Sequence, residues 1–335
     1  MVQVDYSTYE QKAREAGVDL PVEHTPAWAR YERALGREPL GHFVWQDRAF
    51  VAPVKMTGRG FTYAWAKHGP IWAGEPTADD EQQFRAALAE HMPAGLAFVR
   101  LHATHRSADL SELLQTLTFD RTVILDLTMN EEELMASMKK RGRRDVRKAL
   151  RNELTFADET DLFADAFADA YALLIETGAR DKFGIAPENQ YRTMMRELGP
   201  DHARFYTIRD GRDLLCWGIV TLNEQLATYY YAASSAAGRK AGGPDCLVWS
   251  MANDLRSRGV TSFDLMGIDS DRAPQLKGVR DFKTKFSEEV IEVPGAWDYP
   301  LRPRFYRALR RALAAKRQLS AVPAKIRDKV ASRKS

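Results

Sequence analysis

The stretch Phe282-Lys283-Thr284-Lys285-Phe286 carries two cations between large aromatic rings. Its alternation predicts a strand in which the lysines share one face and the phenylalanines share the other. This pattern is typical of any amphipathic strand that points its lysines into solvent. It also fits a strand at the edge of a cleft, because the run Phe263 to Asp269 just before it predicts a strand that leads into a loop.

Two blocks of the chain are strongly basic. Residues 139–151 hold 8 Lys/Arg and one acid, Asp145, and residues 301–335 hold 12 Lys/Arg and one acid, Asp328. Because the whole chain carries a net charge of +3, residues 1–300 carry −8. Such blocks indicate an anionic partner, which could be a nucleic acid, phospholipid headgroups or a phosphorylated substrate. Either block could also be a solvated helix face without a partner.

The bulk composition is that of a globular protein large enough for two domains, with 335 residues and 44% hydrophobic residues. The two cysteines, Cys216 and Cys246, lie in apolar surroundings, so a reducing compartment is expected rather than a disulfide framework. The sequence shows neither a signal peptide nor an apolar run long enough to span a bilayer. We therefore expect a soluble cytoplasmic protein.

Strand and helix signals alternate along both halves of the chain. The second half predicts a helix (161–177), a hairpin (203–209 and 214–222), a third strand (226–232), a helix (245–258) and a strand (262–266). This is the element order of the acetyltransferase fold, and a similar order runs from 23 to 127, with a strand at Thr122 to Leu127 closing the first half. The prediction is an α/β protein with mixed sheets and two tandem acetyltransferase-like (GNAT-type) domains, residues 1–150 and 151–300. A basic amphipathic C-terminal helix and tail follow at 301–335, and the helix is expected to join the first domain.

Two helices carry the basic blocks. One is expected to begin at Asn130 as the N-cap, followed by three glutamates that favour a helix N-terminus; Leu134, Met138, Val146 and Leu150 would form its buried stripe. The other begins after Pro303 and has an apolar side that includes Phe305, Leu309 and Leu319. A helix of that kind is expected at a membrane surface, although its apolar side could equally pack on the body of the protein.

Taken together, these pieces resemble the FemABX peptidyltransferases, which transfer amino acids from aminoacyl-tRNA to the peptide stem of peptidoglycan precursors. The resemblance covers most of the chain, and its order and spacing are more specific than any single piece. The matching pieces are Trp28, His68-Gly69-Pro70, Thr122 to Leu127, Lys139 to Ala149, Thr177 to Phe183, Tyr229 to Ser234, Phe263 to Gly267 and Phe282 to Phe286. The chain looks like the members that lack a coiled-coil arm.

The resemblance implies a role for each matching site residue. Lys283 would stabilise the oxyanion that forms when an amine attacks the aminoacyl ester, with Phe282 and Lys285 beside it. Arg180 would hold substrate phosphates, and Tyr229 and Tyr231, on one face of their strand, would line the same cleft. The basic helix would attract tRNA or precursor phosphates through the residues Arg143, Arg144, Arg147 and Lys148.

The resemblance also sets expectations for partners and cofactors. Aminoacyl-tRNA would be the co-substrate, no further cofactor or metal would be needed, and no acyl-enzyme would form. The acceptor would be the lipid-linked precursor (lipid II) or the soluble UDP-MurNAc-pentapeptide. The protein would be a monomer, and its basic C-terminal helix would be its contact with the inner face of the membrane. Some members carry a lysine soon after the early tryptophan, where this chain has Arg30, Tyr31 and Glu32, and His102 stands where an acid is common.

Three alternatives remain open. An acyl-CoA-dependent N-acyltransferase would share the fold, and Arg239-Lys240-Ala241-Gly242-Gly243-Pro244 resembles its pyrophosphate turn except that Pro244 lacks an N–H. An adaptor for nucleic acid or membranes would explain the basic blocks but not Lys283. A metal site has the weakest support, because His102 and His105 have no accompanying acidic or cysteine ligands.

Overall fold

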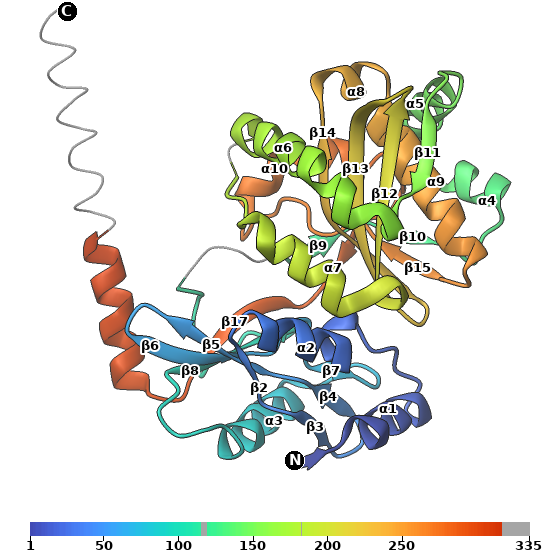
Figure 1. The fold of residues 1–335 in the computed structure, drawn as a ribbon. Coiled ribbons are helices and arrows are strands. Elements are labelled where there is room, and N and C mark those ends of the chain that lie inside the picture. The colour runs from blue at the N-terminus through green and yellow to red at the C-terminus, as the bar shows by residue number, and fades with distance from the viewer. Residues whose placement is uncertain (115–118, 182, 317–335) are drawn as a thin grey trace, which may run out of the picture.

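A computed structural model describes residues 1–114, 119–181 and 183–316 (Figure 1). The chain forms two α/β bodies. We call the body built on one six-stranded sheet the second domain, and the body that contains a five-stranded and a four-stranded sheet the first domain. Within the described residues, no helix has both the length and the hydropathy to cross a bilayer.

The six-stranded sheet of the second domain has the strand order β10-β15-β14-β13-β12-β11. Its strands are β10 (Ile124–Asp126), β11 (Thr155–Asp158), β12 (Ala203–Asp210), β13 (Asp213–Asn223), β14 (Leu226–Ser234) and β15 (Ser262–Asp264). One face is covered by α6 (Phe163–Asp181) and α7 (Glu188–His202), and the other by α5 (Lys140–Ala149) and α9 (Gly243–Ser257) (Figure 1). Alternate residues of β13 therefore enter different cores: Val220 packs with α9, and Ile219 with α6.

The first domain combines a five-stranded sheet, in the order β17-β8-β6-β5-β2, with a four-stranded sheet, in the order β1-β3-β4-β7. The strands are β1 (Val2–Val4), β2 (Glu38–Pro39), β3 (His42–Trp45), β4 (Ala49–Val51), β5 (Val54–Gly58), β6 (Phe61–Trp65), β7 (Ile71–Trp72), β8 (Phe98–Ala103) and β17 (Gly295–Pro300). Helix α3 (Ala78–Glu90) packs Phe84 and Leu88 against both sheets, and α1 (Tyr6–Glu15) packs on the four-stranded sheet.

Helix α2 (Pro26–Ala34) joins the two domains. It begins at the predicted N-cap, because the Thr25 hydroxyl accepts a hydrogen bond from the Trp28 N–H at 3.2 Å. Trp28 and Tyr31, both buried, belong to the same apolar cluster as Tyr191 of α7. The cluster under α6 and α7 therefore continues into the first domain.

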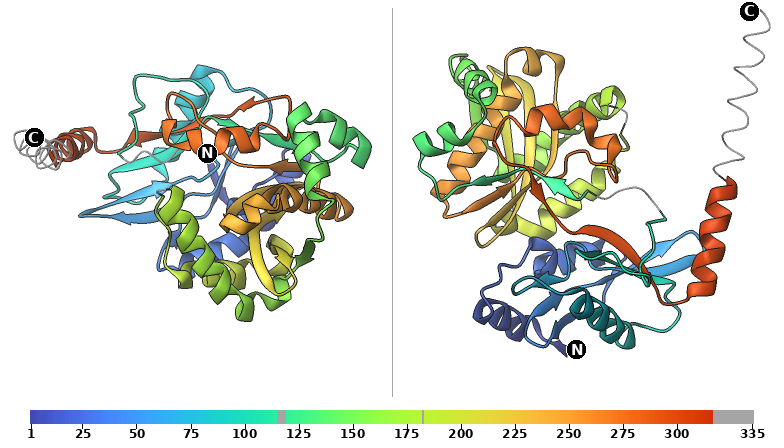
Figure 2. Two further views of the ribbon diagram at one scale, coloured as in Figure 1. Left: turned by 90° about the horizontal axis from the view of Figure 1, so that it is seen from above. Right: turned by 180° about the vertical axis from the view of Figure 1, so that it is seen from behind.

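The two domains exchange a strand. In the second domain an antiparallel hairpin (β13, β14) is followed by a helix (α9) and a parallel strand (β15), and β5, β6, α3 and β8 repeat this arrangement in the first domain. The next position in each sheet is filled from the other half of the chain. Strand β10 pairs with β15, and β17 pairs with β8 (Figure 2, right). A short ladder between β9 (Arg121–Thr122) and β16 (Ile291–Glu292) runs beside these crossings.

The prediction that Thr122 to Leu127 closes the first half is therefore wrong. Apolar alternation marks these residues as a strand, but it does not say which sheet they join, and Leu125 pairs with Phe263 of the second domain. The domain boundaries at residues 150 and 300 stay a prediction. In the structure, residues 124–126 belong to the sheet of the second domain, and residues 295–300 belong to a sheet of the first domain.

The helix predicted to begin at Asn130 is two helices, α4 (Glu131–Ser137) and α5. Asn130 caps α4 in a capping box with Glu133, as its sequence signals predict. The backbone is extended at Met138 and Lys139, and the Arg143 guanidinium donates to the carbonyl oxygens of Ala136 and Met138 at the end of α4. Of the predicted buried stripe, Leu134, Met138 and Val146 are buried, whereas Leu150 is 46% exposed because it lies at the free end of α5.

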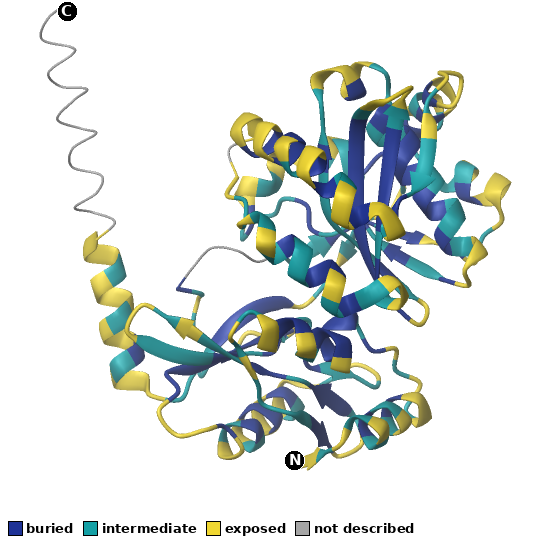
Figure 3. Ribbon diagram, viewed as in Figure 1, coloured by how far each residue is buried: buried dark blue, intermediate teal, exposed yellow. Residues whose placement is uncertain are grey.

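The C-terminal helix spans residues 303–316 of the described chain. Tyr306 is buried against the first domain, and Phe305, Leu309 and Leu313 pack around the same cluster. Packing on the body, one of the two alternatives left open by the sequence, is thus confirmed for this part of the helix. Its remaining surface is mostly exposed and includes Arg307 and Arg310 (Figure 3). Arg317 and Leu319 lie outside the described residues.

The remaining helices are short. They are α8 (Ala236–Lys240), between β14 and α9, and α10 (Lys277–Lys283), which follows β15 and its loop. The longest helix among the described residues is α6, with 19 residues, so this part of the chain contains no coiled-coil arm.

We predict that the β17–β8 pairing depends on the buried carboxylate of Asp298. It accepts two hydrogen bonds from Arg100, at 2.8 and 3.1 Å, and one from the Tyr306 hydroxyl at 2.7 Å. Asp298→Ala leaves the Arg100 charge buried without a partner and should lower the free energy of unfolding by about 3–5 kcal/mol, as measured by urea denaturation.

The matched control is Glu38→Ala, which removes the carboxylate of an exposed pair with Lys55 and should cost at most about 1 kcal/mol. A loss in Asp298→Ala no larger than in this control would contradict a structural role for the buried pair.

Candidate functional site

Lys283 lies at the end of helix α10, so the predicted strand over residues 282–286 is wrong. The chain makes a 3-10 turn, η3 (Pro274–Leu276), continues as α10 and leaves it through a turn at Thr284 and Lys285. Phe282 and Phe286 still share a face, with ring centroids 5.3 Å apart. Residues four apart share a face in a helix as well as in a strand, so their spacing did not separate the two structures.

The ammonium group of Lys283 is held by the loop that follows β15. Its Nζ donates to the carbonyl oxygens of Met266 and Gly267, at 3.1 and 2.9 Å. Burial of the amine lowers the pKa of Lys283 to about 8, and the nearby charge of Asp264 opposes that change. Below pH 8 the Lys283 ammonium is therefore a fixed cation. Its hydrogen-bond partners are two neutral carbonyl groups rather than a carboxylate.

Asp264, the last residue of β15, is fixed by its own hydrogen bonds. Its carboxylate accepts from the Thr122 hydroxyl of β9 and from the Met266 N–H, the latter at 2.7 Å. Burial raises the pKa of Asp264, although the Thr122 hydrogen bond and the positive charges of His68 and Lys283 act in the opposite direction. Met266 has a φ of +63°, a left-handed conformation that non-glycine residues seldom adopt. The loop that holds Lys283 is thus a defined turn.

A cavity of about 270 Å³ lies between the two domains beside this turn. The second domain contributes Asp264 and Thr228 to its lining, and the first domain contributes His68 and His102. The two imidazole rings lie 5.7 Å apart. His102 Nδ1 lies 2.7 Å from the Pro294 carbonyl oxygen, and burial lowers the pKa of His102 to about 4, so this imidazole is neutral at physiological pH.

A buried charge cluster stands next to His68 at the domain interface. Glu23, on the short helix η1 (Val22–His24), lies 3.7 Å from Lys67 Nζ and accepts a hydrogen bond from the Tyr230 hydroxyl at 2.9 Å. Lys67 also donates to Tyr230 and sits 4.8 Å from the centre of the Trp28 ring. Burial lowers the pKa of Lys67, while the carboxylate of Glu23 opposes this. These groups connect the first domain to β14 of the second.

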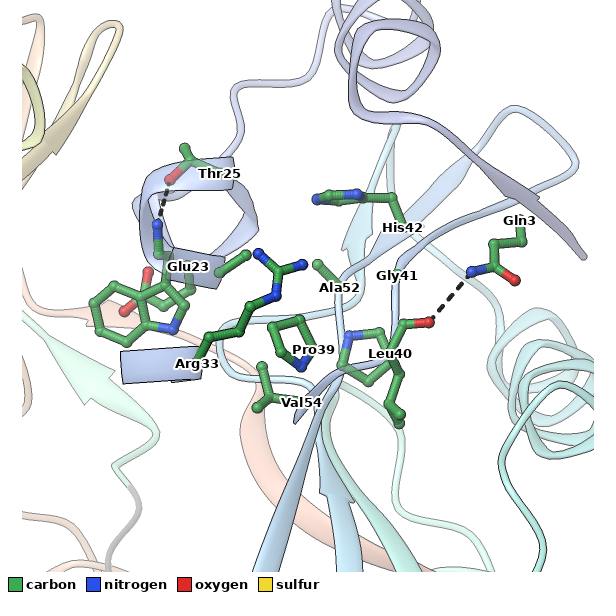
Figure 4. Close-up of a pocket in the computed structure, with 13 residues that line it drawn as sticks. Gln3, Glu23, Thr25, Arg33, Pro39, Leu40, Gly41, His42, Ala52 and Val54 are labelled. Carbon is green, nitrogen blue, oxygen red and sulfur yellow. Dashed lines mark hydrogen bonds between the residues drawn. The ribbon is translucent and has the colours of Figure 1, made fainter. Parts of the chain in front are cut away.

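A second cavity, of about 220 Å³, opens on the first-domain side of Glu23 (Figure 4). Arg33 reaches into it from the end of α2, and His42 and Gly41 form part of its opposite wall (Figure 4). An arginine in a cleft of this size suits a small anionic group. The sequence pattern did not identify Arg33, because its position on α2 is that of an ordinary exposed helix residue.

Tyr229 and Tyr231 do not share a face of β14, contrary to the prediction. The ladder with β13 pairs Val220 with Tyr229 and Ile219 with Tyr231, which leaves Tyr230 as the extra residue of a β-bulge. Tyr229 consequently packs in the core under α9, whereas Tyr231 packs against Tyr191 of α7. The bulged residue Tyr230 is the tyrosine that contacts the buried charges at the domain interface.

Arg180, near the end of α6, is engaged with its own surroundings. It makes a bidentate pair with Asp181, with both N···O distances at 2.8 Å, and donates to the Ser234 carbonyl oxygen at 2.9 Å. Arg239 donates to the same oxygen at 2.8 Å. The two arginines thus meet at the end of β14, a place where a phosphate could replace Asp181 as the partner of Arg180; its phosphate role stays a prediction.

Lys285 is buried and paired with carboxylates. It forms ion pairs with Asp145 of α5 and Asp245 of α9, and its backbone carbonyl accepts from the Lys139 N–H at 3.2 Å. Gly142 allows this approach, because a Cβ there would lie 2.0 Å from the Lys285 oxygen. Lys285 thus connects the end of α10 to α5 and α9. Lys283 and Lys285 have different partners because the chain turns at the end of α10 and points the two side chains in different directions.

The predicted phosphate-binding residues of α5 divide into two pairs. Arg143 closes the end of α4, and Arg144 donates twice to Asp145, at 3.1 and 3.0 Å. Arg147 and Lys148 are exposed on the outer surface of the second domain. Among the described residues, no group of three or more His, Cys, Asp or Glu side chains is arranged to hold a metal ion.

Sequence reasoning missed the roles that His68 and Asp264 have in the cavity. Both stood in motifs that the sequence singled out, but neither motif says that a turn after β6 would meet the end of β15 across the domain interface. A histidine before Gly-Pro and an acid at a strand end were the available signals.

The chain is similar to known proteins in part of its sequence and in its fold. Residues 209–314 match the model of the FemAB family. A crystal structure of FemX matches with a TM-score of 0.73 and 16% identity, over 92% of this chain and 100% of that one. The structure of L-PGS from Bacillus licheniformis matches with a TM-score of 0.52 and 13% identity, over 93% of this chain and 98% of that one. No curated protein matches the sequence significantly. The fold class predicted from the sequence is confirmed.

We predict that the two lysines of the opening motif differ in what they stabilise. Lys285→Met leaves Asp245 buried without its cation and should lower the free energy of unfolding by about 3 kcal/mol. Lys283→Met removes an ammonium that only carbonyl oxygens hold and should cost about 1 kcal/mol. Urea denaturation of both variants at pH 7 measures the difference, and equal losses would contradict it.

Proposed function

Because this chain is a member of the FemABX family, as the match over residues 209–314 and the shared fold with FemX indicate, we propose that it is an aminoacyl-tRNA-dependent transferase. It transfers an amino acid to the amino group of the stem peptide of a peptidoglycan precursor. The observation that carries the proposal is the cation of Lys283, which is fixed by two carbonyls of the turn whose first residue, Asp264, lines a cavity between the domains.

The chemistry of ester aminolysis suits this site. The amine attacks the ester carbonyl, and negative charge develops on the carbonyl oxygen, which the Lys283 ammonium stabilises. A site between two domains can hold the donor and the acceptor together, so that the bimolecular encounter becomes an intramolecular step. The ester is already activated, and this reaction needs no cofactor beyond the co-substrate.

Direct attack is favoured over an acyl-enzyme. Both cysteines, Cys216 and Cys246, are buried in the second domain, and burial raises the pKa of each thiol. A thiol that stays protonated is a poor nucleophile. The amine of the acceptor is therefore the attacking group in the proposed reaction.

The exposed residues of α5 are the proposed contact for tRNA. Arg147 and Lys148 lie free on the helix surface, whereas Arg143 and Arg144 are partly engaged. Lysine and arginine on one exposed helix attract the phosphate backbone without reading a sequence.

The form of the acceptor is linked to the C-terminal helix. Its apolar side begins on the first domain at Tyr306, and its arginines face outward. Such a surface favours anionic lipid headgroups by charge. We therefore favour the lipid-linked precursor and a peripheral position at the inner membrane face, with the protein acting as a monomer.

The alternative of a coenzyme A donor is disfavoured by the turn before α9. The N–H groups of Gly242, Asp245 and Cys246 are used within the turn, at 3.2, 3.1 and 3.0 Å, and Pro244 has none. The Asp245 carboxylate, which is paired with Lys285, occupies the same helix end. A pyrophosphate needs free donors and no competing anion at such a site.

We predict that incubation with a mixed pool of charged tRNAs and a lipid-linked or soluble precursor increases the precursor mass by one amino acid residue, because the fixed cation of Lys283 stabilises the oxyanion. Mass spectrometry of the product is the measurement. Acetyl-CoA replaces the charged tRNAs in a parallel reaction, and acetylation there without aminoacylation would turn the assignment to the alternative donor. No mass increase with either donor would exclude both functions.

Variants of Lys283 serve as the controls for that reaction. Lys283→Ala should lower kcat about 10²- to 10³-fold. In the wild type kcat should fall as the pH rises through about 8, because the amine becomes neutral. Lys283→Arg, whose charge persists, should lack that fall, and a wild-type profile in this variant would assign the titration to another group.

We predict that Arg147→Ala/Lys148→Ala weakens binding to uncharged tRNA and lowers the slope of log K against log salt by about 2, because two phosphate contacts are lost. Fluorescence anisotropy at several salt concentrations measures the slope. Lys12→Ala/Arg14→Ala on α1 removes the same charge from the first domain and should leave the slope unchanged. Equal slopes for both double variants would place the tRNA elsewhere.

A further inference from the structure

His68 lies at the domain interface in a sparsely populated backbone conformation. It follows β6 at the domain interface and lines the cavity opposite Asp264, whose turn receives the Lys283 ammonium. Its φ is +52°, in the left-handed region. A histidine held there costs conformational energy, and such residues persist where the surrounding structure demands them, often at functional sites.

A buried carboxylate stands behind the His68 ring. Glu23 Oε1 lies 3.9 Å from His68 Nε2, and the Glu23 side chain is 4% exposed. Although burial acts to raise it, the pKa of Glu23 lies below its ordinary value because His68 and Lys67 are close. The Tyr230 hydroxyl fixes the same carboxylate oxygen at 2.9 Å. A charged carboxylate next to an imidazole orients the ring.

The proposed transfer needs a group that takes a proton from nitrogen. When the amine attacks, a C–N bond forms, the carbonyl π electrons move to oxygen, and the nitrogen becomes positively charged. Unless that nitrogen loses a proton, the amine leaves again more readily than the tRNA hydroxyl. The Lys283 ammonium stabilises the negative charge on oxygen, but a cation cannot accept the proton from nitrogen.

We propose that His68, oriented by Glu23, is the general base that accepts the proton of the attacking amine, a role that rests on the proposed transfer reaction. The imidazole takes the proton as the C–N bond forms. When the oxyanion collapses, the C–O bond to the ribose breaks, and the imidazolium returns the proton to the departing ribose oxygen. The products are the amide and the free tRNA hydroxyl, so atoms and charges balance.

The other ionisable groups around His68 are less suited to this role. They are Glu23 and His24 on η1, Lys67, His102 on β8, Asp264 on β15 and Lys283 on α10. His102 is a weak base with a pKa of about 4, and Asp264 is bound by Thr122 and by the Met266 N–H. Glu23 is screened from the cavity by the hydrogen bond of Tyr230 and by His68 itself.

The test is the variant His68→Asn, because asparagine tolerates a positive φ and keeps a polar side chain. With charged tRNA and precursor, kcat should fall about 10²- to 10⁴-fold. The rise of kcat with pH on the acid side of the wild-type profile should disappear. The loss should be much smaller with hydroxylamine as the acceptor, because this weakly basic amine is unprotonated at neutral pH and depends less on a base.

Matched variants separate catalysis from folding. His91→Asn changes an exposed histidine at the end of α3 and should leave both kcat and the pH profile unchanged. Glu23→Gln should also lower kcat, but by less than His68→Asn, because the ring loses the carboxylate that orients it while the base itself remains. A structural role for His68 would instead lower kcat equally for both acceptors and leave the profile shape unchanged.

Two failures can be told apart. A wild type that transfers no amino acid would overturn the proposed function, and the role of His68 with it. If the wild type transfers an amino acid and the His68→Asn variant has the same kcat and the same acid-side rise, only the role of His68 as the general base is overturned.

Discussion

A buried ion pair of the first domain, hydrogen-bonded by a tyrosine of the second, sets the geometry of this protein. Glu23 and Lys67 come from the first domain, and the Tyr230 hydroxyl that bonds to Glu23 comes from the second. If the second domain moved away, the ion pair would stay in the first domain, but Glu23 and Lys67 would each lose the Tyr230 hydroxyl as a hydrogen-bond partner, which is costly for buried groups. This contact lies next to the cavity that has His68 on one wall and Asp264 on the other.

The same contact explains why the β-bulge in β14 matters. In a regular strand Tyr229 and Tyr231 would point the same way, and the residue between them would point into the opposite core. The inserted Tyr230 shifts its neighbours to different cores and places its own hydroxyl at the interface. One extra residue in a ladder thus couples the packing of both sheet faces to the charges of the other domain.

Sequence patterns predicted most elements and the fold class, since local signals determine them: the cap at Asn130 and the hairpin of β12 and β13 lie where expected. The patterns failed where two structures share a period, as at Phe282 and Phe286, and where pairing is non-local, as for β10. The candidate base His68 was out of reach for the second reason, because its partners stand 45 residues before it and 196 residues after it in the sequence.

The exchanged strands have a consequence for how the chain is made. Strand β17, at residues 295–300, completes the sheet whose other members end with β8 at residue 103. A ribosome builds the chain from its N-terminus, so the edge of β8 remains unpaired while nearly two hundred further residues are synthesised. Until then the nascent first domain carries an open sheet edge, where wrong strand pairing is possible and where a nascent-chain chaperone could shield it.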